Sequence, residues 1–293
     1  MSQTLCSTHG FSVDKEADVL RLKEAIAQCR HCQGSGLLVV TQNLHGRHYE
    51  EARPCKKRRL LHRASLLAAA KIPPLFQSVS FGDYMPKNDE QTRALEMAKM
   101  YASQPPVPRG FLLSGPVGTG KTHLLAATLR QLILEFGVRA SYVEISLLYA
   151  AIRRGFQEGK SGGEIINPLV NAQLLAIDEL GKGRLSPFEL ETLDELISRR
   201  YNEKKPTLFA TNYSLGTLAN TPNRPSPYVT SGELLEKGKE PHLLVERIGE
   251  RIFSRICHVC DLVEFPPATP DQRKASQFPP AAAHLRKTGK RRM

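Results

Sequence analysis

The sequence lacks any apolar run that approaches the length of a membrane span. The N-terminus also lacks the pattern of a signal peptide, in which positive charges precede an apolar stretch. These two absences speak against integral membrane proteins and secreted proteins, and we expect a cytoplasmic protein with no membrane partner. In that compartment the six cysteines are expected to be thiols or metal ligands rather than disulfides.

Acidic residues are absent from two segments that are rich in lysine and arginine, residues 52–82 and 284–293. The lysines and arginines of these two segments account for the whole net charge of +12. Elsewhere the 29 acidic residues of the chain are balanced by an equal number of basic ones. Basic segments of this kind favour a polyanionic partner, most often nucleic acid, and solvated tails that only improve solubility are the alternative.

A chain of 293 residues is long enough for one α/β domain and a smaller module. From Gly110 onward, apolar strands alternate with amphipathic helices, which is typical of a parallel sheet covered by helices on both faces. The strands expected are Gly110–Ser114, Ala140–Ile145, Leu174–Ile177, Thr207–Thr211 and Asp261–Phe265. The helices expected are Asn88–Tyr101, Lys121–Phe136, Ser146–Phe156, Phe188–Asn202 and His242–Ile256, the second of them stopped by Gly137. The fold class expected is therefore α/β with a five-stranded parallel sheet.

Proline-rich stretches indicate the division of the chain. Ile72–Phe76 reads as a rigid break, so we expect an N-terminal module over residues 1–70 and a core over residues 71–267. The polar stretch Asn220–Pro241 is expected to be an exposed loop inserted in the core. The remainder, residues 268–293, is rich in proline, alanine and basic residues and is expected to be a basic disordered tail.

The most informative motif follows the first core strand and opens the helix after it. It fits the pattern G-x-x-x-x-G-K-[ST], whose backbone N–H groups surround a phosphate chain. We expect it to bind ATP, with the lysine on the β- and γ-phosphates and the threonine hydroxyl on Mg²⁺. A structural glycine turn is the alternative reading. The residues of the motif are Gly115, Pro116, Val117, Gly118, Thr119, Gly120, Lys121 and Thr122.

Two further strands end in polar residues. Leu174–Ile177 leads into Asp178 and Glu179, and we expect this strand to lie beside the strand of the phosphate loop. Asp178 would then hold Mg²⁺ through water, and Glu179 would position the attacking water. Solvated carboxylates at a strand end are the alternative. Thr207–Thr211 leads into Asn212, which is expected to contact the γ-phosphate or that water, an ordinary turn residue being the other reading.

Arg251 and Arg255 lie at positions i and i+4 of an expected helix, and neither has an acidic residue on the same face C-terminal to it. An arginine in this situation is a candidate to reach the γ-phosphate of a neighbouring subunit.

These motifs, in the order Gly115–Thr122, Leu174–Glu179, Ala210–Asn212 and Glu250–Arg255, resemble those of the AAA+ ATPases. Lys121–Leu124 and Ile177–Gly181 are similar to the DnaC/DnaI helicase-loader and IstB branch, as is Ala70–Phe76 with the segment at Phe81. The resemblance covers about residues 70–273. It implies a role for His123 in the nucleotide site, Asn212 as sensor 1, and Arg255, or less directly Arg251, as an arginine finger. Only 28 residues follow Phe265, so we expect no full helical lid.

The N-terminal module contains Cys29 and Cys32 in a C-x-x-C arrangement, followed by glycines. Leu37–Thr41 and Tyr49–Arg53 read as a hairpin that returns Cys55 to the same place. Three thiolates at the open end of a hairpin suit zinc. The alternative is a former metal site whose cysteines are now uncoordinated thiols. The fourth ligand stays open among His62, Cys6 and His9, because His45 and His48 lie near the hairpin tip. A second pair, Cys257 and Cys260, leads into an apolar strand and reads as core thiols.

The resemblance implies an ATP-dependent loader that places a replicative hexameric DNA helicase on single-stranded DNA and that self-associates when ATP is bound. A transposition helper ATPase of the IstB kind shares the same core and is the nearest alternative. A small-molecule kinase would also have a phosphate loop, but it needs an acceptor pocket and a lid that the sequence does not indicate. A zinc module with a degenerate ATPase fold conflicts with the joint presence of Lys121, Thr122, Asp178 and Glu179.

Overall fold

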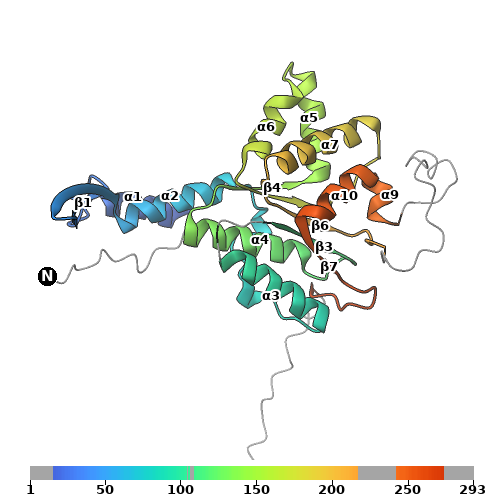
Figure 1. The fold of residues 1–293 in the computed structure, drawn as a ribbon, viewed down its shortest axis with the longest axis horizontal. Coiled ribbons are helices and arrows are strands. Elements are labelled where there is room, and N and C mark those ends of the chain that lie inside the picture. The colour runs from blue at the N-terminus through green and yellow to red at the C-terminus, as the bar shows by residue number, and fades with distance from the viewer. Residues whose placement is uncertain (1–15, 104, 106–108, 217–241, 274–293) are drawn as a thin grey trace, which may run out of the picture.

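The computed structural model describes residues 16–103, 105, 109–216 and 242–273. A small N-terminal unit contains helix α1 (Glu16–Ala27), the antiparallel strands β1 (Leu37–Leu44) and β2 (Arg47–Pro54), and helix α2 (Lys56–Ala69). This unit projects from the larger α/β part of the molecule (Figure 1). The predicted hairpin is confirmed, and its pairing extends beyond the expected strands as far as a tight turn at His45 and Gly46, both with positive φ.

The larger part is built on five parallel strands in the order β4-β5-β6-β3-β7, which confirms the predicted fold class. Each strand lies within one residue of its expected bounds, and every residue of β3, β5 and β6 is buried. The strands are β3 (Gly110–Ser114), β4 (Ala140–Glu144), β5 (Leu174–Asp178), β6 (Thr207–Thr211) and β7 (Cys260–Glu264).

The expected adjacency of β5 and the phosphate-loop strand β3 is wrong. Strand β6 lies between them and is hydrogen-bonded to both. Because all the strands are parallel, their carboxyl ends nevertheless meet at one edge of the sheet, where open α/β sheets bind their ligands. The residues that follow β3, β5 and β6 therefore share that edge.

Helices cover the two faces of the sheet in two separate hydrophobic clusters. Phe111 and Leu113 of β3 point into the first cluster, whereas Leu112 points into the second, as expected for alternating side chains of a strand. The first cluster is closed by α3 (Asp89–Ser103) and α4 (Lys121–Gln131). The second is closed by α5 (Ile145–Gln157), α6 (Gly162–Asn171), α7 (Pro187–Asn202), α9 (Leu244–Ile248) and α10 (Glu250–Val259). Within the described residues, no helix is long and apolar enough to cross a membrane.

Glycine sets two helix boundaries of the core. The helix that opens at Lys121 continues past α4 as a π-helical turn over Leu132–Phe136 and ends at Gly137, with φ of +73°, as the sequence predicts. The single helix expected over His242–Ile256 is wrong, because Gly249, with φ of +81°, separates α9 from α10. That φ favours glycine and interrupts helical geometry.

The N-terminal unit is joined to the core by its last helix. Leu67 and Ala70, which the sequence assigns to the N-terminal module, pack in the first hydrophobic cluster of the core. Arg63 of α2 donates hydrogen bonds to the carbonyl oxygens of Leu134 at 2.6 Å and Glu135 at 2.7 Å. Helix α2 therefore ends against the far end of the helix that begins at the phosphate loop.

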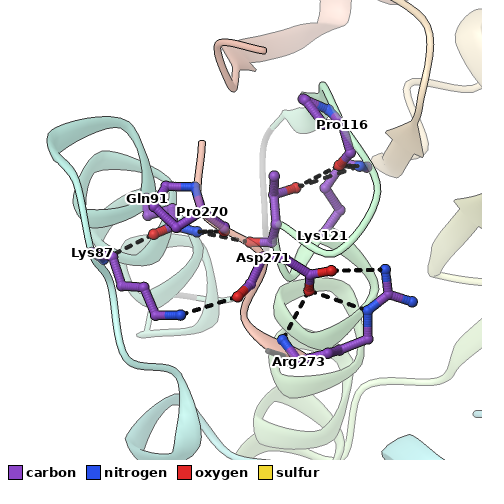
Figure 2. Close-up of polar contacts among 8 residues, drawn as sticks. Lys87, Gln91, Pro116, Lys121, Pro270, Asp271 and Arg273 are labelled. Atoms are coloured by element: carbon purple, nitrogen blue, oxygen red, sulfur yellow. Dashed lines mark hydrogen bonds and ion pairs between the residues drawn. The ribbon is translucent and has the colours of Figure 1, made fainter. Parts of the chain in front are cut away.

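The chain after β7 turns back over the phosphate loop. The backbone N–H of Gln272 donates to the carbonyl of Gly118 at 2.8 Å, and Lys87 and Gln91 of the α3 region donate to the carbonyls of Asp271 and Pro270 (Figure 2). The sequence predicts a disordered tail from residue 268, whereas the residues up to Arg273 lie on the loop. Residues 274–293, the expected insertion Asn220–Pro241, and Cys6 and His9 lie outside the described part of the chain.

Candidate functional site

The phosphate loop forms the predicted turn between strand β3 and helix α4. Gly118 has φ of +83°, a conformation that favours glycine, and a Cβ atom there would also displace the Asp271 carboxylate, which would lie 2.2 Å away. Thr119 is buried, and Val117 is 63% exposed at the rim of the loop. The loop therefore presents backbone N–H groups at the start of a helix, where anions bind.

Lys121 lies inside the loop with 7% of its surface exposed. Its Nζ donates to the carbonyl oxygens of Gly115 and Pro116, each at 2.7 Å (Figure 2). Burial lowers the pKa of Lys121 to about 8, and the nearby Asp178 opposes this shift. A phosphate chain in the loop would offer this ammonium stronger partners than two neutral carbonyls.

The Asp178 carboxylate accepts hydrogen bonds from two hydroxyl groups that lie on other elements. Thr122 Oγ1 and Tyr142 OH each donate to Asp178 Oδ2 at 2.7 Å. Burial raises the pKa of Tyr142, and the charge of Asp178 raises it further, so the phenol stays a hydrogen-bond donor. A carboxylate and a hydroxyl in contact beside a phosphate loop are the oxygen ligands that Mg²⁺ takes together with water and phosphate, so these residues fit the ion.

Glu179 follows Asp178 with φ of +53°, which turns its side chain away from the line of the strand. Its carboxylate is ion-paired with Lys182, whose Nζ also lies 3.4 Å from Glu144 Oε1 at the end of β4. The hydrogen bond to Glu179 is the main reason that the pKa of Lys182 is raised. The predicted water-positioning residue is therefore held by a cation in this structure.

These residues surround one cavity of about 370 Å³. Asn212, which follows β6, lines it together with the loop, so the residues predicted from three separate motifs do come together. Thr211 fixes this end of β6 by donating from Oγ1 to the Leu180 carbonyl at 2.7 Å. The lining comprises Phe76, Asp83, Tyr84, Val117, Gly118, Gly120, Lys121, Thr122, His123, Asp178, Glu179, Thr211, Asn212, Gln272 and Arg273.

His123 lines the cavity as the resemblance implies, whereas its neighbour Tyr84 has no signal in the sequence motifs. Tyr84 OH donates to the Thr119 carbonyl at 2.8 Å, and the Tyr84 ring contacts His123 with centroids 5.6 Å apart. His123 Nε2 lies 2.8 Å from the carbonyl oxygen of Ser80. The sequence indicates Phe76 only as part of a rigid break and of the family resemblance, not as a residue of the cavity. Arg273 has no motif signal, because it lies in a proline-rich stretch that reads as a tail.

Arg251 and Arg255 lie on α10, away from the lining of this cavity, and face α7 of the same chain. Arg255 donates to Asp194 Oδ1 at 3.0 Å and also to Ser198, and its side chain is 24% exposed. Arg251 Nη2 lies 3.4 Å from Asp194 Oδ2 with its side chain 71% exposed. The acidic partner that α10 does not offer C-terminal to these arginines is therefore supplied by Asp194 of α7.

The three predicted thiols of the N-terminal unit converge. Cys29, Cys32 and Cys55 are buried, and their Sγ atoms lie within 4.8 Å of one another. Burial raises the pKa of Cys32, and the two neighbouring thiols raise it further. Within the described residues this group contains no histidine, so neither His62 nor the hairpin-tip histidines belong to it. Cys260, by contrast, is a buried core thiol whose Sγ donates to the Thr207 carbonyl at 3.6 Å.

The basic run that begins at Arg53 is partly structural. Lys57 donates to the Ala25 carbonyl, Arg58 to the Ser35 carbonyl, and Arg63 to the end of the phosphate-loop helix. Arg53 is paired with Glu51. Fewer cations of this run are available to a polyanion than the sequence suggests.

Comparisons with known proteins agree with this geometry. A family model described as IstB-like ATP binding protein matches residues 41–222, more than half of the chain. Over 167 residues the chain is 32% identical to the replicative helicase loader DnaC of Escherichia coli strain K12. The aligned region is 56% of this chain and 65% of that relative. The chain thus spans a little less than two thirds of the length of the curated relatives it matches first.

Solved structures show the same fold. The crystal structure of the DnaC helicase loader has a TM-score of 0.52 at 28% identity, covering 66% of this chain and 99% of that one. The crystal structure of DnaI has a TM-score of 0.51 at 21% identity, and the match covers 67% of this chain and 95% of that one. A family match over more than half of its length, on a fold shared with DnaC, makes this chain a member of the IstB-like ATP-binding protein family.

Proposed function

We propose that the protein is an ATPase that loads a replicative hexameric DNA helicase onto single-stranded DNA during DNA replication. The observation that carries the proposal is the convergence of Lys121, Thr122, Asp178, Glu179 and Asn212 on one cavity of a DnaC-like core. A cytoplasmic location belongs to the same proposal.

In this proposal Lys121 and the loop N–H groups bind the phosphates, and Thr122 and Asp178 hold Mg²⁺. An ion held there would neutralise negative charge that develops on the phosphates during hydrolysis. Glu179 orients and polarises the attacking water, and Asn212 contacts that water or the γ-phosphate. Arg273 lines the cavity wall with its Nε 3.2 Å from Asp271 Oδ1, so it would contribute charge to the phosphates only by exchanging that carboxylate.

Arg255 is the proposed arginine finger that reaches the nucleotide of a neighbouring copy, with Arg251 as the alternative. Support for Arg251 comes from its exposure, 71% of the side chain against 24% for Arg255. Either assignment requires the ATP-bound protein to form a homo-oligomer, since neither arginine lines the cavity of its own chain.

The N-terminal unit is proposed to bind zinc through Cys29, Cys32 and Cys55 and to contact the helicase. Three buried thiols within mutual reach fit zinc, which takes four ligands in structural sites. The zinc would hold the end of α1, the base of the hairpin and the start of α2 together.

A transposition helper ATPase is the second candidate, because the matching family model carries the IstB description. ATP turnover with and without single-stranded DNA tests the ATPase, and co-purification with a replicative helicase or with a transposase separates the two roles. Phosphoryl transfer to a metabolite, without DNA stimulation, would instead support a kinase and overturn both.

A further inference from the structure

A second cavity, of about 430 Å³, lies at the opposite edge of the sheet from the nucleotide site. Gly110 and Thr207, the first residues of β3 and β6, line it, whereas the nucleotide site is formed by residues that follow these strands. The last turns of α7 and α10 supply much of the remaining lining. Cavities of roughly 300–1,000 Å³ hold small molecules. This cavity is therefore large enough for a ligand of its own.

Apolar side chains form much of the buried lining. Ile197, Phe209 and Ile256 are all buried, and an apolar group that packs against them loses its contact with water. Tyr201 and His258 add two rings whose centroids are 5.7 Å apart, with Tyr201 OH 2.9 Å from His258 Nδ1. Rings of this kind pack well against a planar aromatic body.

The exposed part of the lining carries cations. Lys204 is exposed, and its side chain has no hydrogen bond or ion pair within the described residues. Lys205 and Arg109 are paired with Glu203 and Asp261, neither of which lines the cavity. Among the described residues the lining contains no carboxylate at all. A cleft with apolar walls and charges of one sign concentrates ions of the opposite sign, in this case anions.

Arg200 places a further positive charge in the buried part of the lining, where it is only 1% exposed. Its Nε donates to Thr207 Oγ1 at 2.8 Å, and its Nη1 donates to three carbonyl oxygens at the end of α6. Its Nη2 carries two hydrogens and donates to one acceptor, the Pro206 carbonyl at 2.6 Å, which leaves one N–H for a ligand. All these acceptors are neutral, and a buried charge without a counter-ion favours an anion beside it.

We propose that this cavity is a binding site for a small anion with an aromatic body, of the class of aromatic carboxylates. The body packs on Ile197, Phe209 and Ile256, and the carboxylate is turned toward Arg200 and Lys204. The inference does not depend on the proposed ATPase function, because no residue of this lining belongs to the nucleotide cavity.

Titration calorimetry on the full chain with three probes tests the two halves of the proposal. The aromatic carboxylate 2-naphthoate should bind at one site per chain. The uncharged 2-naphthol keeps the aromatic body and should bind about tenfold more weakly or less, because it lacks the charge-assisted hydrogen bonds. Inorganic sulfate keeps the charge without the body and should not compete. Absence of saturable 2-naphthoate binding, or equal affinities for 2-naphthoate and 2-naphthol, overturns the proposal.

Variants locate the bound 2-naphthoate. Lys204→Gln should weaken it about two- to fivefold. Arg199→Gln is the matched control and should leave the affinity unchanged, because Arg199 is paired with Glu195 on the exposed side of α7 and does not line the cavity. Val259→Phe fills part of the cavity and should reduce binding further, with thermal unfolding as the check on folding. Equal losses in Lys204→Gln and Arg199→Gln contradict the assignment.

Two further titrations exclude other sites and other occupants. Saturating ATP should leave 2-naphthoate binding intact, and displacement by ATP would place the probe in the nucleotide cavity and overturn the proposal. The peptide Glu-Glu-Phe-Glu-Glu offers the same charge and an aromatic ring on a protein segment. If it binds about tenfold more tightly than 2-naphthoate and is weakened by Lys204→Gln, the cavity is a protein docking site and the small-molecule assignment is wrong.

Discussion

The side chains of Thr122 and Asp178, 56 residues apart in the chain, meet in a hydrogen bond of 2.7 Å. Thr122 belongs to the first turn of α4, and Asp178 ends a strand that is not adjacent to the one before the phosphate loop. Tyr142 approaches the same carboxylate oxygen from β4. Three elements therefore fix the proposed magnesium ligands before nucleotide binds, which reduces the ordering that binding requires.

Lys121→Ala and Glu179→Gln should affect different steps of the reaction. Lys121→Ala removes a cation that contacts phosphate in the ground state, so ATP affinity should fall about 10- to 100-fold. Glu179→Gln should keep its affinity for ATP and lose roughly 100-fold or more in kcat, because the residue acts on the attacking water. Titration with a fluorescent ATP analogue and single-turnover hydrolysis measure the two effects.

Thr119→Val is a useful control for this pair, because the change keeps the backbone N–H through which the loop is expected to bind phosphate and removes a hydroxyl that donates to the Pro116 carbonyl at 3.1 Å. It should retain both binding and hydrolysis to a larger extent than either variant. Equal losses of nucleotide affinity in Lys121→Ala and Glu179→Gln would refute the division of roles.

ATP affinity should depend on pH through Lys121, whose pKa burial lowers to about 8. Bound phosphates favour the ammonium form and raise that pKa, so binding takes up a proton above pH 8 or so. Affinity should therefore be high below about pH 8 and fall as pH rises through it, by at most tenfold per pH unit. Calorimetry in buffers of different ionisation enthalpy measures this proton uptake. Lys121→Arg, which stays charged, should lose this dependence, and an unchanged pH profile would contradict the assignment.

A mixture of two inactive variants tests whether Arg255 acts between subunits. Arg255→Ala should bind ATP as a monomer but hydrolyse little, whereas Glu179→Gln retains the arginine and lacks turnover. In mixed assemblies the second variant donates its arginine to the intact site of the first, so ATPase activity should partly recover. Light scattering confirms that the two proteins assemble.

The same mixture made with Arg251→Ala decides between the two arginines. Because both pair with Asp194, an Asp194→Asn variant reports the structural effect of losing that contact alone. Absence of recovery in co-assembled mixtures of either arginine variant would show that the arginines act within their own subunit.

Zinc and the fold of the N-terminal unit should depend on each other. The purified protein should carry about one zinc per chain, and Cys32→Ser should lose the metal and helicase binding while the distant nucleotide site still binds ATP. Cys260→Ser is the control, since that thiol is buried in the core and bonded to Thr207. Zinc-free protein, prepared without chelator, that still binds the helicase would remove the zinc proposal.

A contact between the N-terminal unit and DNA rather than helicase predicts a different result for Cys32→Ser. Single-strand binding would then weaken, with a smaller dependence on salt. Lys57, Arg58 and Arg63 donate hydrogen bonds to carbonyl oxygens within the chain. We therefore expect fewer cations to contact DNA than the basic run contains, and a correspondingly smaller change in the slope of DNA affinity against salt concentration.

The sequence predicts the parts of the site that lie within short motifs. Lys121, Thr122, Asp178 and Glu179 are found at the expected strand ends because local hydrophobic pattern and glycine spacing determine both strand and loop. Strand order is not local, and the position of β6 between β5 and β3 is invisible to such patterns. Long-range contacts are equally hidden, which is why the partnership of Arg255 with Asp194 and the place of Arg273 at the cavity were missed.

Arg63 binds the last carbonyls of the helix whose first turn contains Lys121 and Thr122. The far end of that helix is held by α2, whose first residue follows Cys55. The thiol cluster and the phosphate loop are therefore at the two outer ends of a pair of helices that meet where Arg63 binds Leu134 and Glu135.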